Sequence, residues 1–190
     1  MHTSRLPLVG IVILALSLAP AAVLAQDEAE GVTSRYLAGK LIGLGSTDYE
    51  NPLGCEPWVI DDEGTEAPTP TLTNTVIGET TLLGPTAMMS ELCLSFTAVL
   101  DDVTKGTFTM GGDSGELSGT WSGDCTPIGV AMGEQFMCTG LMEVTGGTGM
   151  YEGASGQFRT NADYWNAGFD SDGLWKDSPT AWFIEGLVEY

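Results

Sequence analysis

Apolar and polar residues alternate with a period of two along most of this chain. Across 90–100, apolar side chains recur at every second position from Leu92, while Cys93 and small hydroxyl residues occupy most positions between them. This period places the two kinds of side chain on opposite faces of a β-strand, and no window shows convincing helical spacing. The alternation predicts eight strands, at 36–44, 72–83, 90–100, 106–110, 116–123, 134–144, 154–165 and 181–189.

The connections between these segments favour an antiparallel arrangement. They contain turn-forming residues, as at 101–102, 111–115 and 146–149. Short connections make consecutive strands neighbours in a sheet, and eight such strands can close on themselves without an exposed edge. We therefore expect an all-β fold, an eight-stranded antiparallel up-and-down β-barrel. A two-sheet β-sandwich is the competing arrangement.

Two connections are longer than the others. Residues 45–71 include the acidic run 61–63 and two prolines at 68 and 70, which is the composition of a mobile, solvated loop. The second, at 166–180, is shorter and also acidic. The remaining length suits one domain with a substantial core.

The first 25 residues differ from the rest of the chain. Arg5 precedes an almost wholly apolar run at 6–18, and small, helix-breaking residues at 19–25 end in Val23 and Ala25. This is the pattern of a signal peptide, and the apolar run is too short to span a bilayer core of about 30 Å. We expect cleavage near Ala25, secretion to an extracellular or periplasmic location, and a single mature domain at 26–190.

The charge of the chain excludes several partners. It has 26 acidic against six basic residues and a formal net charge of −20. Nucleic acid and anionic membranes bind through cationic contacts, so we expect neither as a partner. The only histidine, His2, lies in the predicted signal peptide, which removes the commonest general base from the mature chain. No lysine stands in a Ser-x-x-Lys setting that would activate a serine. No cofactor is predicted, and the oligomeric state is left open.

Four cysteines agree with export, because an even count in an oxidising compartment predicts two disulfides. Cys125 and Cys138 flank a glycine-containing turn, and each falls on the face that carries the large apolar residues of its strand. Cys93 points the other way and could tether the long loop that carries Cys55. Of the three possible pairings we predict Cys55–Cys93 with Cys125–Cys138.

One segment resembles a known family. Residues 144–156 read Val-Thr-Gly-Gly-Thr-Gly-Met-Tyr-Glu-Gly-Ala-Ser-Gly. They are similar to the TGGTG-x-[FY]-x-G-A-x-G hairpin of the allene oxide cyclase and dirigent β-barrel superfamily, which secreted bacterial proteins of that barrel type often carry. The segments 106–109, 119–121 and 182–186 are similar in style. The resemblance implies a secreted bacterial member of that superfamily. It assigns no catalytic residue, and the N-terminal half has no counterpart in it.

A calcium site is the one metal site that the residue types suggest. Asp170, Asp172 and Asp177, with Asn166 nearby, are oxygen ligands of the kind calcium takes. No acid stands at the closing position of an EF-hand frame, however. A plain acidic loop is the preferred interpretation, and no metal site is predicted.

The aromatic residues fall mostly on apolar strand faces, where core packing is the default explanation. An eight-stranded barrel can also hold one small ligand, and the glycines at 119, 140, 156 and 186 would leave room for it. Arg159 stands four positions before Asp163 on one strand face, so it either pairs with that acid at the surface or orients an anionic ligand at the barrel mouth. The candidate ligand-binding residues are Tyr36, Trp121, Phe136, Phe158, Tyr164, Trp182 and Arg159.

Three functions are compatible with these residues. The leading hypothesis is a secreted barrel that binds a small apolar or amphipathic molecule without turnover. An isomerase or cyclase of the allene oxide cyclase or dirigent type would work by confining its substrate, and an isolated Glu, Arg or Tyr pointing into an apolar cavity would distinguish it. A structural or adhesive surface module, with the barrel as scaffold for its loops, is the third.

Overall fold

The structure, a computed structural model, describes residues 32–48, 50, 52–56, 58–59, 64, 66–67, 69–94, 104–128, 135–165 and 177–190. All regular elements in these ranges are β-strands, and none of the described residues forms a helix that is long and apolar enough to cross a membrane. The strands are β1 (Ser34–Asp48), β2 (Trp58–Val59), β3 (Glu66–Ala67), β4 (Thr71–Thr80), β5 (Gly84–Cys93), β6 (Thr104–Gly112), β7 (Gly115–Ile128), β8 (Gln135–Gly149), β9 (Ser155–Trp165) and β10 (Ser178–Glu189).

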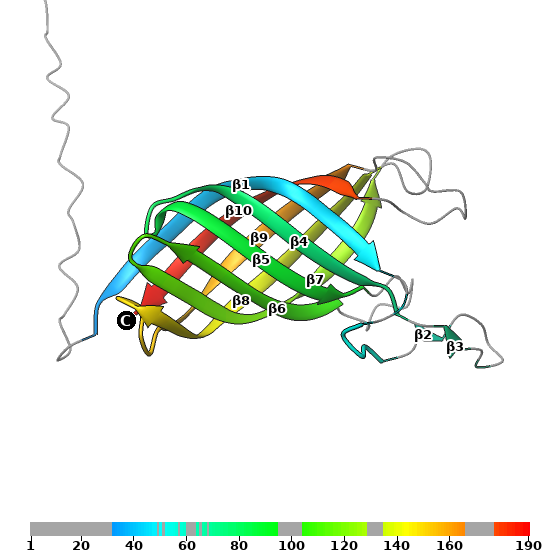
Figure 1. Cartoon of the computed structure of the whole chain (residues 1–190), viewed down its shortest axis with the longest axis horizontal. Coiled ribbons are helices and arrows are strands. Elements are labelled where there is room, and N and C mark those ends of the chain that lie inside the picture. The colour runs from blue at the N-terminus through cyan, green and yellow to red at the C-terminus, as the bar shows by residue number, and fades with distance from the viewer. Residues whose placement is uncertain are drawn as a thin grey trace, which may run out of the picture.

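Eight of these strands form one closed antiparallel barrel in the order β1-β10-β9-β8-β7-β6-β5-β4. Strands that follow one another along the chain from β4 to β10 are neighbours, and β1 closes the barrel by pairing with both β4 and β10. The predicted eight-stranded up-and-down barrel is therefore confirmed, and the two-sheet alternative is not adopted. The strands cross the barrel obliquely, while β2 and β3 pair with each other outside it (Figure 1).

The barrel has two unlike ends. At one end, which we call the turn end, tight turns at 81–83, 113–114 and 150–153 join consecutive strands. The chain also enters and leaves the barrel there, because Thr33 and Tyr190 exchange two backbone hydrogen bonds of 2.8 and 3.0 Å. The longer connections belong to the opposite end, which we call the loop end. The two ends can therefore differ in how they expose the interior.

Alternation along each strand builds the core. In β8, Phe136, Cys138 and Met142 are buried, while Met137 and Leu141 between them face outward and are partly exposed. The same period in the other strands gives one continuous hydrophobic cluster inside the barrel. Burial of this apolar surface, about 25 cal/mol for each Å², is the main stabilising contribution.

Glycines at inward positions are matched by large neighbours. A Cβ at Gly140 would lie 2.5 Å from Trp121 Cζ2, and one at Gly119 would lie 2.9 Å from Phe108 Cε1. A Cβ at Gly186 would likewise lie 2.5 Å from the Phe158 Cβ. The expectation that such glycines leave room for a ligand is therefore wrong at these three positions, because neighbouring aromatic side chains already occupy the space.

Two predicted strand boundaries are corrected at the β4–β5 hairpin. The expected strand at 72–83 ends at Thr80, and β5 begins at Gly84 rather than at residue 90. Gly84 has a φ of 69°, which a tight turn requires and which side chains disfavour. The Thr80 hydroxyl accepts a hydrogen bond from the Leu83 amide at 3.0 Å and stabilises the turn. The apolar residues Leu82 and Leu83 extended the alternating pattern, so the strand was predicted to continue. Residues 95–100, the end of the predicted strand at 90–100, lie outside the described ranges.

The predicted loop at 45–71 is shorter than expected. Strand β1 continues to Asp48 and pairs with the start of β4, from Gly45 opposite Asn74 to Asp48 opposite Thr71. Farther along, the connection contains the two-residue strands β2 and β3. Gly45, at the start of the predicted loop, instead permits close packing beside β4, because a Cβ there would lie 2.8 Å from Asn74 Oδ1.

The predicted turn at 146–149 is also corrected. These residues continue β8 and pair with β7, where Gly149 lies opposite Gly115 and Gly146 opposite Ser118. The register shifts between Ser118 and Gly119, which is a bulge or irregularity of the pairing. The turn itself lies at 150–153. The glycine-rich residues 146–149 therefore have an extended backbone in a hairpin that contains a β-bulge.

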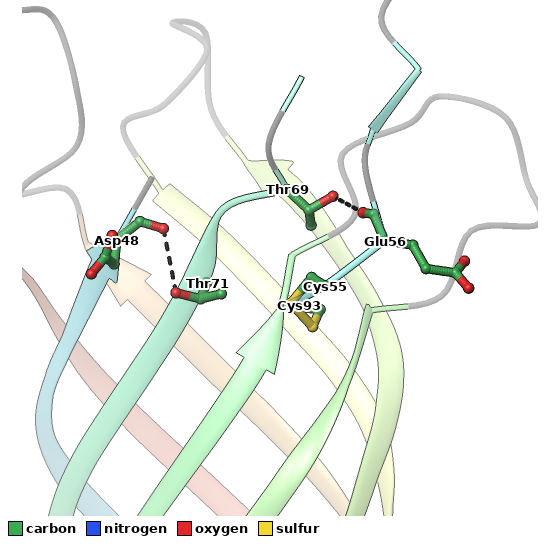
Figure 2. Close-up of a disulfide and its surroundings, with 6 residues drawn as sticks. All are labelled: Asp48, Cys55, Glu56, Thr69, Thr71 and Cys93. Atoms are coloured by element: carbon green, nitrogen blue, oxygen red, sulfur yellow. Dashed lines mark hydrogen bonds between the residues drawn. A yellow bond between two sulfur atoms is a disulfide. The ribbon is translucent and has the colours of Figure 1, made fainter. Parts of the chain in front are cut away.

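Both predicted disulfides are present. Cys55–Cys93, which we call the tether disulfide, joins the loop after β1 to the end of β5, with Cα atoms 5.7 Å apart. Figure 2 shows this loop further held by hydrogen bonds from Thr69 to the Glu56 carbonyl and from Thr71 to the Asp48 carbonyl. Cys125–Cys138, which we call the wall disulfide, joins directly opposite residues of β7 and β8. Such bonds fit an oxidising compartment.

Candidate functional site

The seven predicted site residues separate into two groups. Trp121, Phe136, Phe158, Tyr164 and Trp182 all point into the barrel and are almost completely buried. Tyr36 and Arg159 are exposed on its outer wall. The expectation that Tyr36 shares the apolar face with the other aromatic residues is therefore wrong, and Arg159 does not point into the barrel.

Tyr36 and Arg159 border the same shallow hollow on the outer wall. The Tyr36 hydroxyl donates to Glu185 Oε2 at 3.2 Å, and Arg159 lies opposite Glu185 in the pairing of β9 with β10. Desolvation and the contact with Glu185 raise the pKa of Tyr36 above its ordinary value. The hollow is open, and its charged side chains lie beside exposed leucines, Leu141 and Leu187. These residues form an exposed polar surface rather than an enclosed site.

The interior between the two ends is packed with side chains. The rings of Phe108 and Phe158 meet edge to face at 5.4 Å, and those of Trp121 and Trp182 at 6.5 Å. Tyr151 closes the turn end, since it is buried and donates to the Leu82 carbonyl at 3.0 Å. The Tyr151 ring also packs on Tyr190, with centroids 5.0 Å apart. The packed aromatic layer and this closure leave the loop end as the accessible side.

The loop end of the interior contains an apolar cavity of about 20 Å³. Side chains from β1, β4, β8, β9 and β10, together with Leu94 and the wall disulfide, surround it. A space of this volume accommodates about one water-sized group. A larger molecule can therefore place only one of its ends in the cavity, and the rest of it would lie at the mouth of the barrel. The lining residues are Thr47, Leu72, Leu94, Cys125, Phe136, Cys138, Tyr164 and Ser178.

A cluster of polar side chains adjoins this cavity through Tyr164. Four of its atoms are buried and meet no strict hydrogen-bond geometry: Asn74 Oδ1, Tyr164 OH, Thr180 Oγ1 and Trp182 Nε1. Tyr164 is nevertheless within hydrogen-bonding reach of the side chains of Thr180, Asn74 and Trp182. We call these four residues the polar cluster. Native proteins satisfy the large majority of their buried polar atoms, and each orphan costs roughly 1–3 kcal/mol. The four residues are therefore placed to satisfy one another around the Tyr164 hydroxyl.

The strand register brings the polar cluster together. Thr180 lies directly opposite Tyr164, and Trp182 packs on the same ring, with centroids 6.3 Å apart. Asn74 approaches from the far side of β1, where Gly45 pairs with it. A Cβ at Gly45 would lie 2.8 Å from Asn74 Oδ1 and 3.1 Å from Tyr164 Cε1. The absence of a side chain at Gly45 is therefore what allows Tyr164 and Asn74 to meet.

A second polar pair in the same interior is satisfied and serves as a comparison. Trp121 Nε1 donates to Thr160 Oγ1 at 2.9 Å. The Asn74 amide nitrogen donates to Ser90 Oγ at 3.0 Å, while its carbonyl oxygen faces the Tyr164 hydroxyl. Buried indole and amide groups therefore do find partners elsewhere in this barrel.

Burial raises the pKa of the Tyr164 hydroxyl far above its ordinary value of 10.0. Side-chain hydrogen bonds with Thr180, Asn74 and Trp182 lower the pKa of Tyr164, against this larger effect of burial. Tyr164 is therefore a neutral hydrogen-bond donor throughout the physiological range. No lining residue of the cavity is charged. The arrangement suits recognition of an uncharged group.

Sequence reasoning found Tyr164 and Trp182 but missed their polar partners. Asn74 occupies an inward position between Leu72 and Val76, and an amide on an otherwise apolar face was the signal that could have identified it. Thr180 gave no such signal, because threonine is common on both strand faces. Their proximity depends on barrel closure through β1, which local patterning does not reveal.

The calcium candidates fall mainly outside the described residues. Asp177 is exposed immediately before β10, while Asp170, Asp172 and Asn166 lie in ranges that the structure does not describe. Within the described part of the chain, no group of three or more His, Cys, Asp or Glu residues could hold a metal ion. The calcium hypothesis therefore receives no support from the described geometry.

Comparison with known proteins gave no match. No family model, no curated protein and no solved structure matches this chain.

Proposed function

We propose that this chain is an exported binding protein that takes one end of a small, uncharged amphipathic molecule into the loop end of its barrel, without turnover. The observation that carries this proposal is an apolar cavity at the loop end with an uncharged lining that includes the neutral hydroxyl residue Tyr164. The apolar lining favours a hydrocarbon group by removing it from water. The predicted signal peptide and the two disulfides support export.

The fold supports this function through the difference between its ends. Tyr151 and the aromatic layer close the turn end, whereas the cavity lies near the ends of β1, β4 and β5. The wall disulfide is part of the lining and fixes the distance between β7 and β8 at this level. A pocket held by cross-linked strands is preorganised, which lowers the entropy lost on binding.

Titration with 1-hexanol, a linear amphipathic probe, tests the proposal. Methyl resonances of Leu72 and Leu94 report on the cavity, and those of Leu37 and Leu117, buried away from it, serve as internal controls. We expect saturable shifts at the first pair and none at the second. Absence of a saturable shift at both cavity leucines would refute the proposal.

A matched pair of variants tests the location of the site. Thr47→Trp places a large side chain at the cavity, whereas Thr75→Trp places the same side chain on the exposed outer face of β4. We expect Thr47→Trp to abolish the hexanol response and Thr75→Trp to preserve it. Leu94→Phe fills the cavity from a different strand and should act like Thr47→Trp. Retained binding in both folded cavity variants would contradict the assignment.

A cyclase or isomerase is the second candidate, favoured by one observation. Tyr164 supplies a neutral phenolic hydroxyl at an apolar cavity, as expected for an enzyme that confines and polarises its substrate. The resemblance of residues 144–156 to the allene oxide cyclase and dirigent hairpin supports the same candidate. Recovery of bound molecules in rearranged form after incubation would favour it over binding alone.

A further inference from the structure

A compact group of exposed apolar side chains lies on the outer wall of the barrel, on neighbouring strands (Figure 1). Ile42 and Leu44 on β1, Ile77 on β4 and Met89 on β5 are each between 53% and 63% exposed. The strand register makes them neighbours, because Ile42 lies opposite Ile77, and Thr75 lies between Leu44 and Met89. We call this group the wall patch; it consists of Ile42, Leu44, Thr75, Ile77, Ala87 and Met89.

The wall patch is unusual for the surface of so acidic a chain. All of its residues are uncharged, although the chain has 26 acidic residues. Soluble monomers rarely expose large contiguous apolar areas, and such areas mark interaction sites. The closed barrel has no strand edge that could pair with another sheet, so its association must use an outer face. Two copies of the chain repel each other less at this face than where acidic residues are exposed.

We propose that the wall patch is the interface of a symmetric dimer of this chain, in which Lys40 of each copy pairs with Asp177 of the other copy. A two-fold interface brings the same surface of both subunits together, so that surface must be complementary to itself. The two-fold axis lies in the plane of the interface and crosses the strands midway between the level of Ile42 and the level of Leu44. This inference goes beyond the proposed function and does not depend on it.

The apolar residues of the wall patch are complementary under this rotation. It exchanges the two levels, while each strand faces the same strand of the other copy. Ile42 then meets Leu44, and Ala87 meets Met89. The small Ala87 borders an open hollow of the wall together with Ile77, so the larger Met89 of the other copy has room there. Apolar residues thus form the centre of the interface and charged residues its border, as in specific protein interfaces.

The same rotation brings opposite charges together at the border. Lys40 lies at the level that is exchanged with Ser46, and Asp177 is exposed directly before β10, at the level of Ser46 in the pairing of β10 with β1. The Lys40 ammonium lies 5.2 Å from the centre of the Phe183 ring, so it leans towards β10, the strand that follows Asp177. An axis along β4 would instead bring the two Glu79 carboxylates together, and like charges in an interface cost affinity.

The size of this interface predicts a weak dimer. It covers β10, β1, β4 and β5 and six residue steps along each strand, which is roughly 15 Å by 20 Å between backbone positions. This area is at the small end for a specific interface. We therefore expect a dissociation constant in the micromolar range.

Sedimentation velocity over a micromolar concentration series, at physiological ionic strength, tests for the dimer. Ile77→Glu places a carboxylate of each copy in the interface, whereas Leu141→Glu makes the same kind of change on β8, at the opposite side of the barrel. We expect Ile77→Glu to raise the dissociation constant at least about a hundredfold and Leu141→Glu to leave it unchanged. A wild type that stays monomeric throughout, or a folded Ile77→Glu variant that dimerises like the wild type, would overturn the proposal.

A charge exchange tests the orientation of the two copies. Lys40→Asp and Asp177→Lys should each raise the dissociation constant about tenfold, because each places two pairs of like charges in the dimer. The double variant should restore the wild-type value. Within one chain the two residues lie about 20 Å apart, so restoration can arise only between copies.

Lys105→Asp is the control for the exchange, because it changes the net charge as Lys40→Asp does but replaces an exposed lysine outside the wall patch. It should leave the dissociation constant close to that of the wild type. Unchanged circular dichroism spectra show that each variant is folded. The arrangement is wrong if either single exchange has no effect, or if the double variant does not recover dimerisation.

Discussion

The packing of interior glycines against aromatic side chains makes a sharp prediction for Gly140→Ala. A Cβ at this position would lie 2.5 Å from Trp121 Cζ2, 2.6 Å from Trp121 Cε2 and 2.6 Å from the Ser122 carbonyl oxygen. Two of these atoms belong to a rigid indole that is buried and hydrogen-bonded to Thr160. The indole cannot move aside without disturbing the layer, so the added methyl group must displace backbone or distort the packing.

The size of the effect follows from a matched control. Overpacking of a well-filled core typically costs about 1–3 kcal/mol. Replacement of glycine also stabilises by about 0.4–1 kcal/mol through the unfolded chain, where the native backbone is compatible. Gly111 provides that second contribution alone, because a Cβ there would approach nothing closer than 3.7 Å. The difference between Gly140→Ala and Gly111→Ala therefore isolates the packing cost, about 1–3 kcal/mol.

Denaturant unfolding with both disulfides intact measures this difference. Tryptophan fluorescence should show Gly140→Ala unfolding at lower denaturant concentration than the wild type and Gly111→Ala at an equal or higher one. In a thermal scan the gap corresponds to roughly 2–4 °C for each kcal/mol. Equal stability of the two variants would refute the reasoning. It would mean that space beside Gly140 is available, as a ligand-binding lumen through the barrel requires.

Three further predictions follow from the disulfides and the buried tyrosines. Replacing both cysteines of a disulfide by serine should lower the free energy of unfolding by about 4 kcal/mol for the tether disulfide and by about 3 kcal/mol for the wall disulfide, because they close loops of 38 and 13 residues. Calorimetry under oxidising conditions measures the order of the two effects. The reverse order would contradict the loop-entropy argument. Tyr164 keeps its proton in the folded protein but loses it near pH 10 in the unfolded chain, so its contribution to stability is complete below about pH 10 and declines above it. Above pH 10, the free energy of unfolding should therefore fall less steeply with pH in Tyr164→Phe than in the wild type. An identical pH dependence would argue against the raised pKa. Tyr151→Phe should cost about 1 kcal/mol through loss of the hydrogen bond to the Leu82 carbonyl, measured by denaturant midpoint, and no change would mean that this bond does not help to close the turn end.

Local patterning was sufficient for much of this fold. A period of two along nearly every segment, with turn residues between, indicated antiparallel strands, and their number indicated closure. The side of the strand on which each cysteine stands, inward for Cys125 and Cys138 and outward for Cys93, was also sufficient to select the pairing that the structure shows. These properties are local, because they depend on which face of a strand a side chain occupies.

The predicted strand and turn boundaries were wrong where the local sequence pattern and the strand pairing disagreed. Leu82 and Leu83 look like strand residues but form a turn beside Gly84. Residues 146–149 look like a turn but pair with β7. In both places the neighbouring strand decided the conformation, because its register determined which backbone groups had partners.

The candidate site was decided by tertiary structure. The sequence alone established that residues 26–190 contain no histidine, that the strands have one apolar face and that Tyr164 and Trp182 stand on it. It could not place Asn74 beside them, because that contact crosses β1 at Gly45 and exists only once β1 has paired with both β4 and β10. Nor could it tell that neighbouring aromatic rings occupy the space beside inward glycines. Periodicity determines the face on which a residue lies, whereas barrel closure determines which faces meet and how much space lies between them.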